Sequence, residues 1–346
     1  MRLTPLKLAI FLSQFVFACG TASAADDSIA DFKVSYTDLA PITFDANSVT
    51  SLATEIAIGT DYVINPAAST SFDDAIHYQL RRIETPDLGP YGFGTFFDQT
   101  RSVGLDFIAA LAFTSYTGFS DWDWGTSSFH FTNEGWFGAN TYAGGMDKLG
   151  HVYSTYVFSE YFTQQIAHRN DNIVGAAVTG AILGMAVQTG VEIFDGFSTF
   201  GFSKEDLIAD GIGAGFSVLR STVPGLDKKL DYRIESMKSG SFGFIPADDY
   251  SGQKYLLALK LSGFEQFEDS PLRFVELHAG YFARGFTQAE IDAGDVKRRV
   301  PYFAIGVNLA ELFDVEGVRD TIPALAASTA LQYIQVPYTY GATAQN

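Results

Sequence analysis

A short polar run, Asp147-Lys148-Leu149-Gly150-His151, opens a stretch of apolar residues at helical spacing. Asp147 and His151 are four residues apart, so a helix places both side chains on one face, and Lys148 lies beside them. A carboxylate and an imidazole in this relation suit general acid–base catalysis or the binding of a metal ion. The run is therefore the first candidate for a functional site.

Two later apolar stretches add acids that could meet this run. One ends in Glu192-Ile193-Phe194-Asp195-Gly196, and the other carries Asp206 and Asp210 four residues apart. If the three helices pack as neighbours, one His, one Lys and five carboxylates converge inside an otherwise apolar bundle. The candidate catalytic residues are Asp147, Lys148, His151, Glu192, Asp195 and Asp206.

The same groups could hold a divalent cation. Oxygen donors outnumber nitrogen donors, which favours a hard ion such as Mg²⁺, Mn²⁺ or Ca²⁺, and facing helices can supply its ligands. The candidate metal ligands are His151, Glu192, Asp206 and Asp210. Without a metal ion, crowded carboxylates raise one another's pKa values, and Lys148 opposes that rise.

A structural role for these residues is the alternative. Asp147 would then cap a helix, Asp206 would complete a cap at Ser203, and Lys148 would pair with a carboxylate to neutralise buried charge. Glu192 and Asp195 would form a solvated helix end.

Four helices are expected to position these residues, at about 103–116, 146–168, 173–194 and 204–219. The third is rich in Gly and Ala, and Ala176, Gly180 and Gly184 repeat every four residues, so a neighbouring helix can approach this face closely. Its length suits a membrane span, but its hydrophobicity is only mild, which favours a buried helix.

From Tyr255 onward the apolar period becomes two, which predicts strands at about 255–261, 272–282, 302–309 and 331–338. The predicted fold class is α+β, a Gly/Ala-rich bundle of about four helices followed by an antiparallel sheet. Helices combined with an outer-membrane β-barrel are the alternative. The predicted organisation is a signal peptide at 1–24, an irregular region with a few strands at 25–101, a helical domain at 102–225 and a β region at 240–346.

The first residues have the pattern of a cleavable signal peptide. Arg2 and Lys7 form a basic segment, residues 8–18 are apolar, and Ala22-Ser23-Ala24 supplies the small residues that signal peptidase requires. Val16-Phe17-Ala18-Cys19 also resembles a lipobox, which would make Cys19 a lipidated mature N-terminus. Both processed forms remain open.

Composition excludes several classes of function. Cys19 is the only cysteine, so an intramolecular disulfide and a thiolate metal site are excluded. The net charge of −18 would become −20 once Arg2 and Lys7 are removed with the signal peptide, which argues against nucleic acid as a partner and suits divalent cations. Walker, nucleophile-elbow, dinucleotide-binding and His-Glu-x-x-His motifs do not occur.

An ordered set of motifs carries a family resemblance. The set consists of Glu134-Gly135-Trp136-Phe137, Gly145-Met146-Asp147-Lys148-Leu149-Gly150-His151, Glu192-Ile193-Phe194-Asp195-Gly196 and Gly201-Phe202-Ser203-Lys204-Glu205-Asp206. Over about residues 133–215 it resembles the uncharacterised YfiM-like family of predicted periplasmic lipoproteins.

This resemblance implies an exported helical domain, but no reaction, because the function of the family is unknown. Its polar motif positions correspond here to Asp147, Lys148, His151, Glu192, Asp195, Asp206 and Asp210. At Asp210 the family pattern leads us to expect Asn. The chain is more loosely similar to VanZ-like membrane proteins, which also order an Asp-Lys-x-x-His helix, an acidic helix end and a later Asp. That similarity favours an association with the membrane.

We therefore expect a membrane-associated protein in the periplasm or outer membrane of a Gram-negative bacterium. Its carboxylate–histidine site would act on a lipid or cell-wall component, with or without a metal ion. The alternatives are a non-enzymatic envelope scaffold with a structural polar cluster and, less favoured, a pore built on the C-terminal strands. Expected partners are an envelope membrane or lipid, and a protein bound by the β region or by the aromatic loop of Trp122, Trp124, Phe129, His130, Phe131, Trp136 and Phe137.

Overall fold

The computed structural model of the protein describes residues 91–168, 172–237, 250–314, 318 and 321–343. The predicted signal peptide and Cys19 lie outside the described residues, as does most of the region 25–101. The part of that region which is described is helical rather than irregular, since helix α4 spans Phe93–Ser102.

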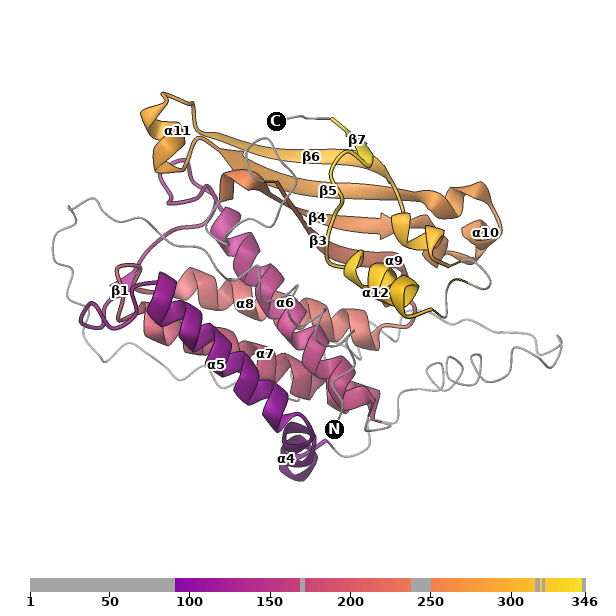
Figure 1. Cartoon of the computed structure of the whole chain (residues 1–346), viewed down its shortest axis with the longest axis horizontal. Helices are drawn as coiled ribbons and strands as arrows, with labels where there is room; N and C mark the ends of the chain where they lie inside the picture. The colour runs from indigo at the N-terminus through magenta and orange to yellow at the C-terminus, as the bar shows by residue number, and fades with distance from the viewer. Residues whose placement is uncertain (1–90, 169–171, 238–249, 315–317, 319–320, 344–346) are drawn as a thin grey trace. The chain divides into compact units, whose positions relative to one another are not determined.

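The four predicted helices are confirmed (Figure 1). They are α5 (Gly104–Asp121), α6 (Met146–Ala167), α7 (Ile173–Asp195) and α8 (Lys204–Thr222). Ser203 caps α8 as predicted, because its hydroxyl accepts a hydrogen bond from the Asp206 backbone N–H at 3.2 Å. Asn172 caps α7 in the same way through the Gly175 N–H at 2.7 Å.

Glycines let α7 and α8 approach α6 closely. A Cβ atom at Gly184 of α7 would lie 2.4 Å from the Ser159 Oγ, and one at Gly213 of α8 would lie 2.2 Å from the Val152 carbonyl oxygen. The close approach predicted for the Ala176, Gly180 and Gly184 face is therefore confirmed at its two glycines. It places the first turns of α6 and α8 and the last turn of α7 side by side.

Helix α7 is the one helix in the described part of the chain that is long and apolar enough to cross a membrane. The mean hydropathy of an 18-residue segment of this helix is 1.6, and 56% of that segment is buried inside the protein. The helix packs against α6 and α8, in the manner of a core helix.

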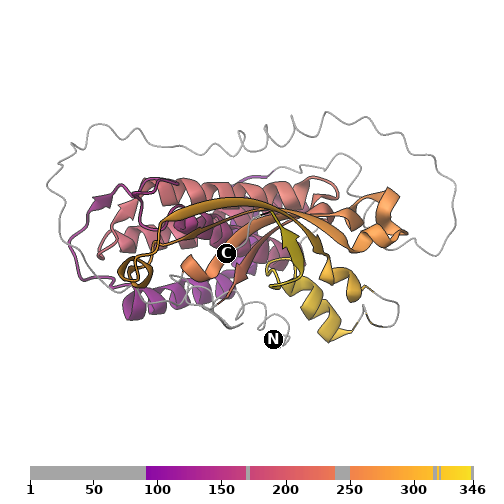
Figure 2. The same ribbon diagram turned by 90° about the horizontal axis from the view of Figure 1, so that it is seen from above.

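The C-terminal strands form an open antiparallel sheet of five strands, in the order β3-β4-β5-β6-β7. They are β3 (Leu230–Ser236), β4 (Gln253–Lys260), β5 (Val275–Arg284), β6 (Arg298–Val307) and β7 (Tyr340–Ala342). Seen from above, the strands curve over the helices (Figure 2). The predicted α+β fold is thus confirmed, with the helices followed by an antiparallel sheet.

The predicted strand at 331–338 is wrong. Residues 322–330 form helix α12 (Ile322–Ala330), and the segment after it makes a single bridge between Ile334 and Ile234. Strand β3 was not predicted, because Asp231, Arg233 and Glu235 alternate along it and suggest a solvated segment. The remaining helical segments are α9 (Leu226–Lys229), α10 (Glu265–Glu268), α11 (Gln288–Asp292) and four short 3₁₀ turns at Tyr250–Gly252, Leu261–Gly263, Pro271–Phe274 and Leu309–Leu312.

The aromatic loop between α5 and α6 packs over one end of the bundle. Its strand β1 (Phe131–Thr132) pairs in parallel with β2 (Phe202–Ser203), just before α8. Trp124 is 5% exposed, and its ring stacks on Phe194 at the end of α7. The loop therefore helps to hold the ends of α7 and α8 in place.

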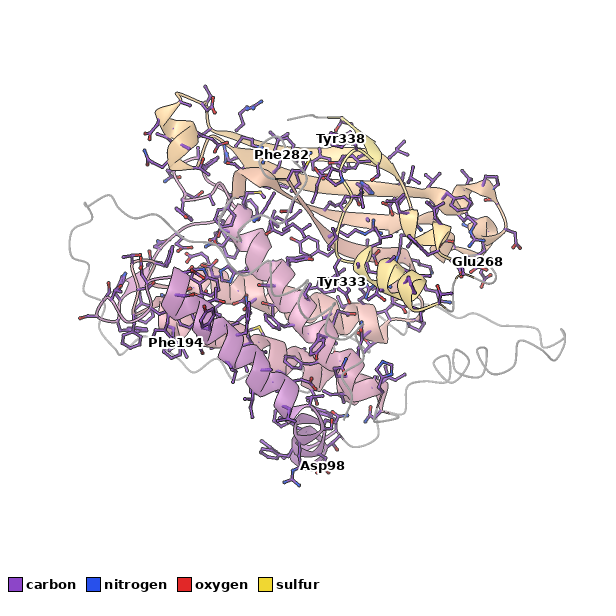
Figure 3. All side chains as sticks on the ribbon, in the orientation of Figure 1. Asp98, Phe194, Glu268, Phe282, Tyr333 and Tyr338 are labelled. Carbon is purple, nitrogen blue, oxygen red and sulfur yellow. The ribbon has the colours of Figure 1, made fainter. Side chains whose placement is uncertain are left out.

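Tyrosines join the helices to the sheet. The Tyr153 hydroxyl of α6 donates to the Tyr333 carbonyl oxygen at 3.0 Å, and the Tyr232 hydroxyl of β3 donates to the Leu149 carbonyl oxygen at 3.0 Å. Figure 3 shows side chains, among them Tyr333, filling the space between the two layers. Because α6 contacts α7, α8 and the sheet, it is the element against which the polar residues are positioned.

Candidate functional site

The polar residues predicted on three helices meet at one place. The first turns of α6 and α8 and the last turn of α7 bring their charged side chains together, and the loop before α6 adds one more acid. We call this group the carboxylate–histidine cluster. Its members are Glu134, Asp147, Lys148, His151, Glu192, Asp206 and Asp210.

His151 lies at the centre of the cluster, between four carboxylates. On one side of the ring, Nε2 is 3.9 Å from Asp147 Oδ1 and 3.8 Å from Asp206 Oδ1. On the other side, Nδ1 is 3.7 Å from Glu192 Oε1 and 3.2 Å from Asp210 Oδ1. The predicted convergence of His151, Glu192 and Asp206 is therefore present in the fold.

Lys148 lies at one edge of the cluster and is 3% exposed. Its Nζ is 2.6 Å from Asp147 Oδ2 and 2.6 Å from Asp206 Oδ1, and it also contacts Glu134 Oε2. One ammonium group thus lies beside three carboxyl groups, donating hydrogen bonds to Glu134 and Asp147 and forming an ion pair with Asp206. This edge of the cluster resembles a buried salt bridge more than a set of metal ligands.

Neighbouring groups orient the carboxylates. Thr155 Oγ1 donates to Asp210 Oδ1 at 2.6 Å, the Ser203 backbone N–H donates to Glu192 Oε2 at 3.1 Å, and the Tyr250 hydroxyl donates to Asp147 Oδ1 at 3.1 Å. Hydrogen bonds of this kind hold carboxylates in one orientation, as is found around metal-binding and catalytic groups.

Burial raises the pKa of the acids of the cluster, but nearby charges decide the direction of the net shift. It raises the pKa of Glu192 to about 9, with Asp206 adding to the rise and His151 opposing it. It raises the pKa of Glu134 to about 10, helped by Asp147 and Asp206. At Asp147 burial is outweighed by the charges of Lys148 and His151, and the pKa falls to about 2.

The imidazole itself favours its charged form. Burial disfavours the imidazolium, but Asp206, Asp210 and Glu192 outweigh that effect and raise the pKa of His151 well above its usual value. At neutral pH the cluster therefore holds two cations, at Lys148 and His151, against five acidic side chains. The excess of acids must be compensated by bound protons or by a further cation.

Two groups of three side chains have the geometry to bind such a cation. Asp147, His151 and Asp206 form one group, and His151, Glu192 and Asp210 form the other, with ligand atoms within 4.8 Å of one another in each. Asp210 is fully buried, and its Oδ2 has no hydrogen-bond partner. Asp206 Oδ1 of the first group also lacks a hydrogen-bond partner, but it forms an ion pair with Lys148 Nζ at 2.6 Å. Since a buried carboxylate oxygen is costly without a partner, Asp210 Oδ2 favours the second group.

The cluster forms one wall of a cavity of about 190 Å³. Glu134, Asp147, His151, Glu192 and Asp206 all line it, so the polar groups are accessible to a molecule inside the protein. Apolar and aromatic side chains make up much of the remaining wall, and they come from α5, α6, α7 and strands β3 and β4. Cavities lined mainly by apolar and aromatic side chains, with a few polar groups, are typical ligand-binding sites.

Asp195 is the predicted site residue that lies apart. Its Oδ1 accepts a hydrogen bond from the Trp124 indole N–H at 2.6 Å, and it belongs to neither of the two ligand groups. Burial raises its pKa to about 7, and Trp124 opposes that rise. Asp195 still lines the cavity, so its catalytic role stays a prediction.

The structural alternatives apply only in part. Gly145 rather than Asp147 is the N-cap of α6, and Asp206 contributes its backbone N–H to the Ser203 cap while its carboxylate contacts Lys148. Glu192 is 1% exposed rather than solvated. Lys148 does pair with carboxylates, as that alternative expects.

Sequence reasoning assigned no role to Glu134, Thr155 or Tyr250. Glu134 precedes Asp147 by thirteen residues in an irregular loop, where no periodicity connects the two. Its presence in the family motif was the only available signal. Tyr250 belongs to the sheet side of the cavity, and its contact with α6 depends on the packing of the two layers.

The comparison with known families supports this segment as a unit. A family model described as predicted periplasmic lipoprotein (DUF2279) matches residues 133–222, which include Glu134 and all of α6, α7 and α8. No curated protein and no solved structure matches the chain. The resemblance of the motifs to this family of predicted periplasmic lipoproteins is therefore confirmed over residues 133–222.

Proposed function

We propose that the protein is an exported envelope protein in which the carboxylate–histidine cluster binds a divalent cation and hydrolyses a lipid or cell-wall component. The observation that carries the proposal is the convergence of an unbalanced set of buried acids and one imidazole on a cavity. Such a set accounts for a cation and a ligand together, whereas a purely structural network needs neither an acid excess nor a cavity.

A hard divalent cation fits the donors best. His151 Nδ1, Glu192 Oε1 and Asp210 would supply one nitrogen and two carboxylates, and Asp210 Oδ2 is the oxygen that lacks a partner. Binding would displace the proton from His151 and from Glu192, so affinity should increase as the pH rises. The Asn expected at position 210 from the family pattern could also offer an oxygen ligand.

The remaining cluster supplies acid–base groups for hydrolysis. In such a reaction a water oxygen would bond to the carbonyl carbon or phosphorus and lose a proton to a carboxylate. The bond from that carbon or phosphorus to the leaving oxygen would break, and the leaving oxygen would take a proton from a general acid. Glu134 holds a proton at neutral pH, because burial and its acidic neighbours raise its pKa to about 10. It lines the cavity and is our candidate for the general acid.

The family description and the N-terminal motif together support the proposed export and membrane anchoring. A predicted periplasmic lipoprotein is exported and membrane-anchored, and the signal sequence with Cys19 agrees with that description. Mass spectrometry of the mature N-terminus tests the anchor. A lipidated Cys19 supports it, and a mature chain that begins at Ala25 contradicts it.

Cation binding is tested by isothermal titration calorimetry with Mn²⁺ and Ca²⁺. We expect Glu192→Gln and Asp210→Asn each to weaken affinity about tenfold or more, because each removes a charged ligand. Glu160→Gln is the matched control: Glu160 is a buried acid of the same bundle, but it pairs with Arg220 and lies outside the cavity lining. Equal affinities in all four proteins, or no binding by the wild type, would contradict the cation site.

A non-enzymatic scaffold is the second candidate, and the triple ion pairing of Lys148 favours it. In that case Lys148→Met should destabilise the fold by about 3–5 kcal/mol, as expected when one partner of a buried ion pair is removed. The same loss of stability without any cation binding in the wild type would favour the scaffold over the enzyme.

A further inference from the structure

The lining of the cavity changes from polar to apolar along α6. Its polar end lies at His151, and the residues that line it further along the helix are Ser154, Val157 and Phe158. At a rise of 1.5 Å per residue, the step from His151 to Phe158 corresponds to about 10 Å. The cavity thus extends about two helical turns away from the charged cluster.

The wall around this second part is apolar. Val191 of α7 and Ile234 of β3 are buried and line the cavity, and the rings of Tyr153 and Tyr255 line it too. Both hydroxyls are engaged elsewhere, Tyr153 with the Tyr333 carbonyl oxygen at 3.0 Å and Tyr255 with Gln253 Oε1 at 2.8 Å. These tyrosines therefore present mainly ring carbons to a ligand.

The apolar part has a closed end. Beyond Phe158, Ser159 of α6 packs directly against Gly184 of α7, and no described residue past this contact on either helix lines the cavity. A volume of about 190 Å³ in total exceeds that of an apolar protein cavity that binds benzene, which is about 150 Å³. The space suits the first segment of a chain or a group of ring size.

The polar side chains that line the cavity outside the charged cluster already make hydrogen bonds within the protein, among them Thr114, Gln188 and Gln253. The Ser154 hydroxyl donates to the His151 carbonyl oxygen at 3.2 Å and accepts from Gln188 Nε2 at 2.5 Å. A sugar carries hydroxyl groups along its whole length, and burying them against Val157, Val191 and Ile234 would be costly. An alkyl chain has no such cost.

Helix α5 separates the cavity from an apolar surface. Thr114 of α5 lines the cavity, whereas Leu105, Ile108, Tyr116 and Phe119 of the same helix are exposed. An uncharged helix face of this kind favours contact with the boundary of a lipid layer.

We propose that the cavity binds an amphiphile of lipid origin, with its polar head at His151 and Glu192 and the first part of its alkyl or acyl chain along α6 toward Phe158. The inference rests on the proposed function and names its substrate class, choosing a lipid over a cell-wall glycan. The chain-binding part is formed by Val157, Phe158, Val191, Ile234 and Tyr255, none of which belongs to the charged cluster.

Chain binding is tested by the quenching of tryptophan fluorescence with a brominated alkyl maltoside, whose uncharged head does not depend on the cation. Trp122 lines the cavity, so we expect saturable quenching in the wild type that Trp122→Phe removes. Val157→Phe and Val191→Phe fill the apolar part and should weaken the apparent affinity about tenfold or more. Ile182→Phe is the matched control, since Ile182 is an exposed residue of α7.

A further variant controls for misfolding of the two Phe variants, in which the cavity is filled. Val157→Thr keeps the shape of the side chain but adds a hydroxyl at a buried position, so it should weaken chain binding at a cost of about 1–3 kcal/mol in stability. A cooperative thermal transition of this variant shows that its weaker quenching does not come from unfolding. Unbrominated alkyl maltoside should compete with the quencher, and maltose should not. Quenching that is equal in all variants, or competition by maltose alone, would overturn the proposal.

The experiment separates this inference from the cation site. Glu192→Gln should lose Mn²⁺ binding and keep the quenching, whereas Val191→Phe should lose the quenching and keep Mn²⁺ binding. If the wild type binds Mn²⁺ but not the alkyl chain, the amphiphile is refuted and the cation site stands. If it binds the chain but not Mn²⁺, the cation site is refuted and a lipid-binding cavity stands.

Discussion

Two groups of buried charges include residues of α6, one at Lys148 and His151 and the other at Glu160, and they differ in their balance of charge. The carboxylate–histidine cluster has five acidic side chains and two cations. The second group, which we call the interlayer network, joins the helices to the sheet and has three acids and three cations. Its members are Glu160, Arg220, Asp231, Arg233, Lys260 and Glu276.

Each acid of the interlayer network faces a cation at hydrogen-bond distance. Asp231 alone contacts Arg220 at 3.0 Å, Arg233 at 2.7 Å and Lys260 at 2.8 Å. These three cations outweigh the effect of burial and lower the pKa of Asp231 to about 2. No member of the network lines the cavity.

The difference shows how buried charge in this fold can be assigned to stability or to function. A network with balanced charges compensates its own charge and links two layers, so its loss should cost folding free energy. An unbalanced cluster beside a cavity is not satisfied by the protein alone, so its acids should control ligand affinity and the pH dependence of stability. The following predictions test that assignment.

The largest expected effect on stability comes from a substitution in the interlayer network. Arg220→Met leaves Glu160 and Asp231 without one of their cations and should lower the free energy of unfolding by about 3–5 kcal/mol in urea denaturation. Arg273→Met is the control, because Arg273 pairs with Glu311 near the surface and should cost at most about 1 kcal/mol. A loss for Arg220→Met no larger than that of the control would refute the structural role of the network.

A smaller effect is expected where helix spacing controls the cluster. A Cβ at Gly213 would lie 2.2 Å from the Val152 carbonyl oxygen, so Gly213→Ala must move α8 away from α6. We expect a loss of about 1–3 kcal/mol in stability, and also weaker Mn²⁺ binding, because Asp210 lies one turn earlier on α8. Calorimetry and urea denaturation measure the two effects.

Gly211→Ala on the same helix is the matched control for this variant. A Cβ there meets no atom within 4 Å, so the change should stabilise the protein by about 0.4–1 kcal/mol and leave Mn²⁺ affinity unchanged. If both glycine variants behave alike, close helix packing does not position the cluster.

The smallest effect, measured for each pH unit, is a slope of stability against pH in the metal-free protein. The folded protein holds a proton on Glu192 up to a pKa of about 9, which the unfolded chain releases near its usual value of 4.5. The stability from this proton is fully present below that usual value and is lost as the pH rises toward 9. His151, whose pKa is also raised, contributes in the same direction.

We therefore expect stability to fall between about pH 5 and pH 9 with chelator present, by at most about 1.4 kcal/mol per pH unit for each extra proton held by the folded state. Glu192→Gln should flatten this slope, and Glu265→Gln on the surface should not. Asp231 acts in the opposite sense, since its lowered pKa stabilises the protein above the usual value of 3.8 and the effect is lost as the pH falls toward 2. A slope that Glu192→Gln leaves unchanged would contradict the buried proton.

Local patterns were sufficient for the four predicted helices and for three of the four predicted strands, but helices α4 and α12 were not predicted. The apolar period and the Ser203 cap predict α8 because both depend on residues near one another in the chain. The error at 331–338 has a local cause too, since its β-prone residues follow helix α12 in a segment that makes only one bridge. β3 was missed because burial of Asp231 and Arg233 depends on the distant partners Arg220 and Glu276 as well as on their pairing with each other.

Within the candidate site, the sequence by itself determined which residues share a helix face. Asp147 with His151, and Asp206 with Asp210, follow from a spacing of four residues alone. The local sequence also determined the glycine-bearing face of α7, which is a property of side-chain size.

Only the tertiary structure decided that these faces meet, because contact between helices depends on packing between residues far apart in the chain. It brought Glu134 from an irregular loop to Lys148, and it set Asp195 apart through Trp124. It also decided that one buried charge network is balanced while the other borders a cavity, since charge balance and burial are properties of the assembled layers.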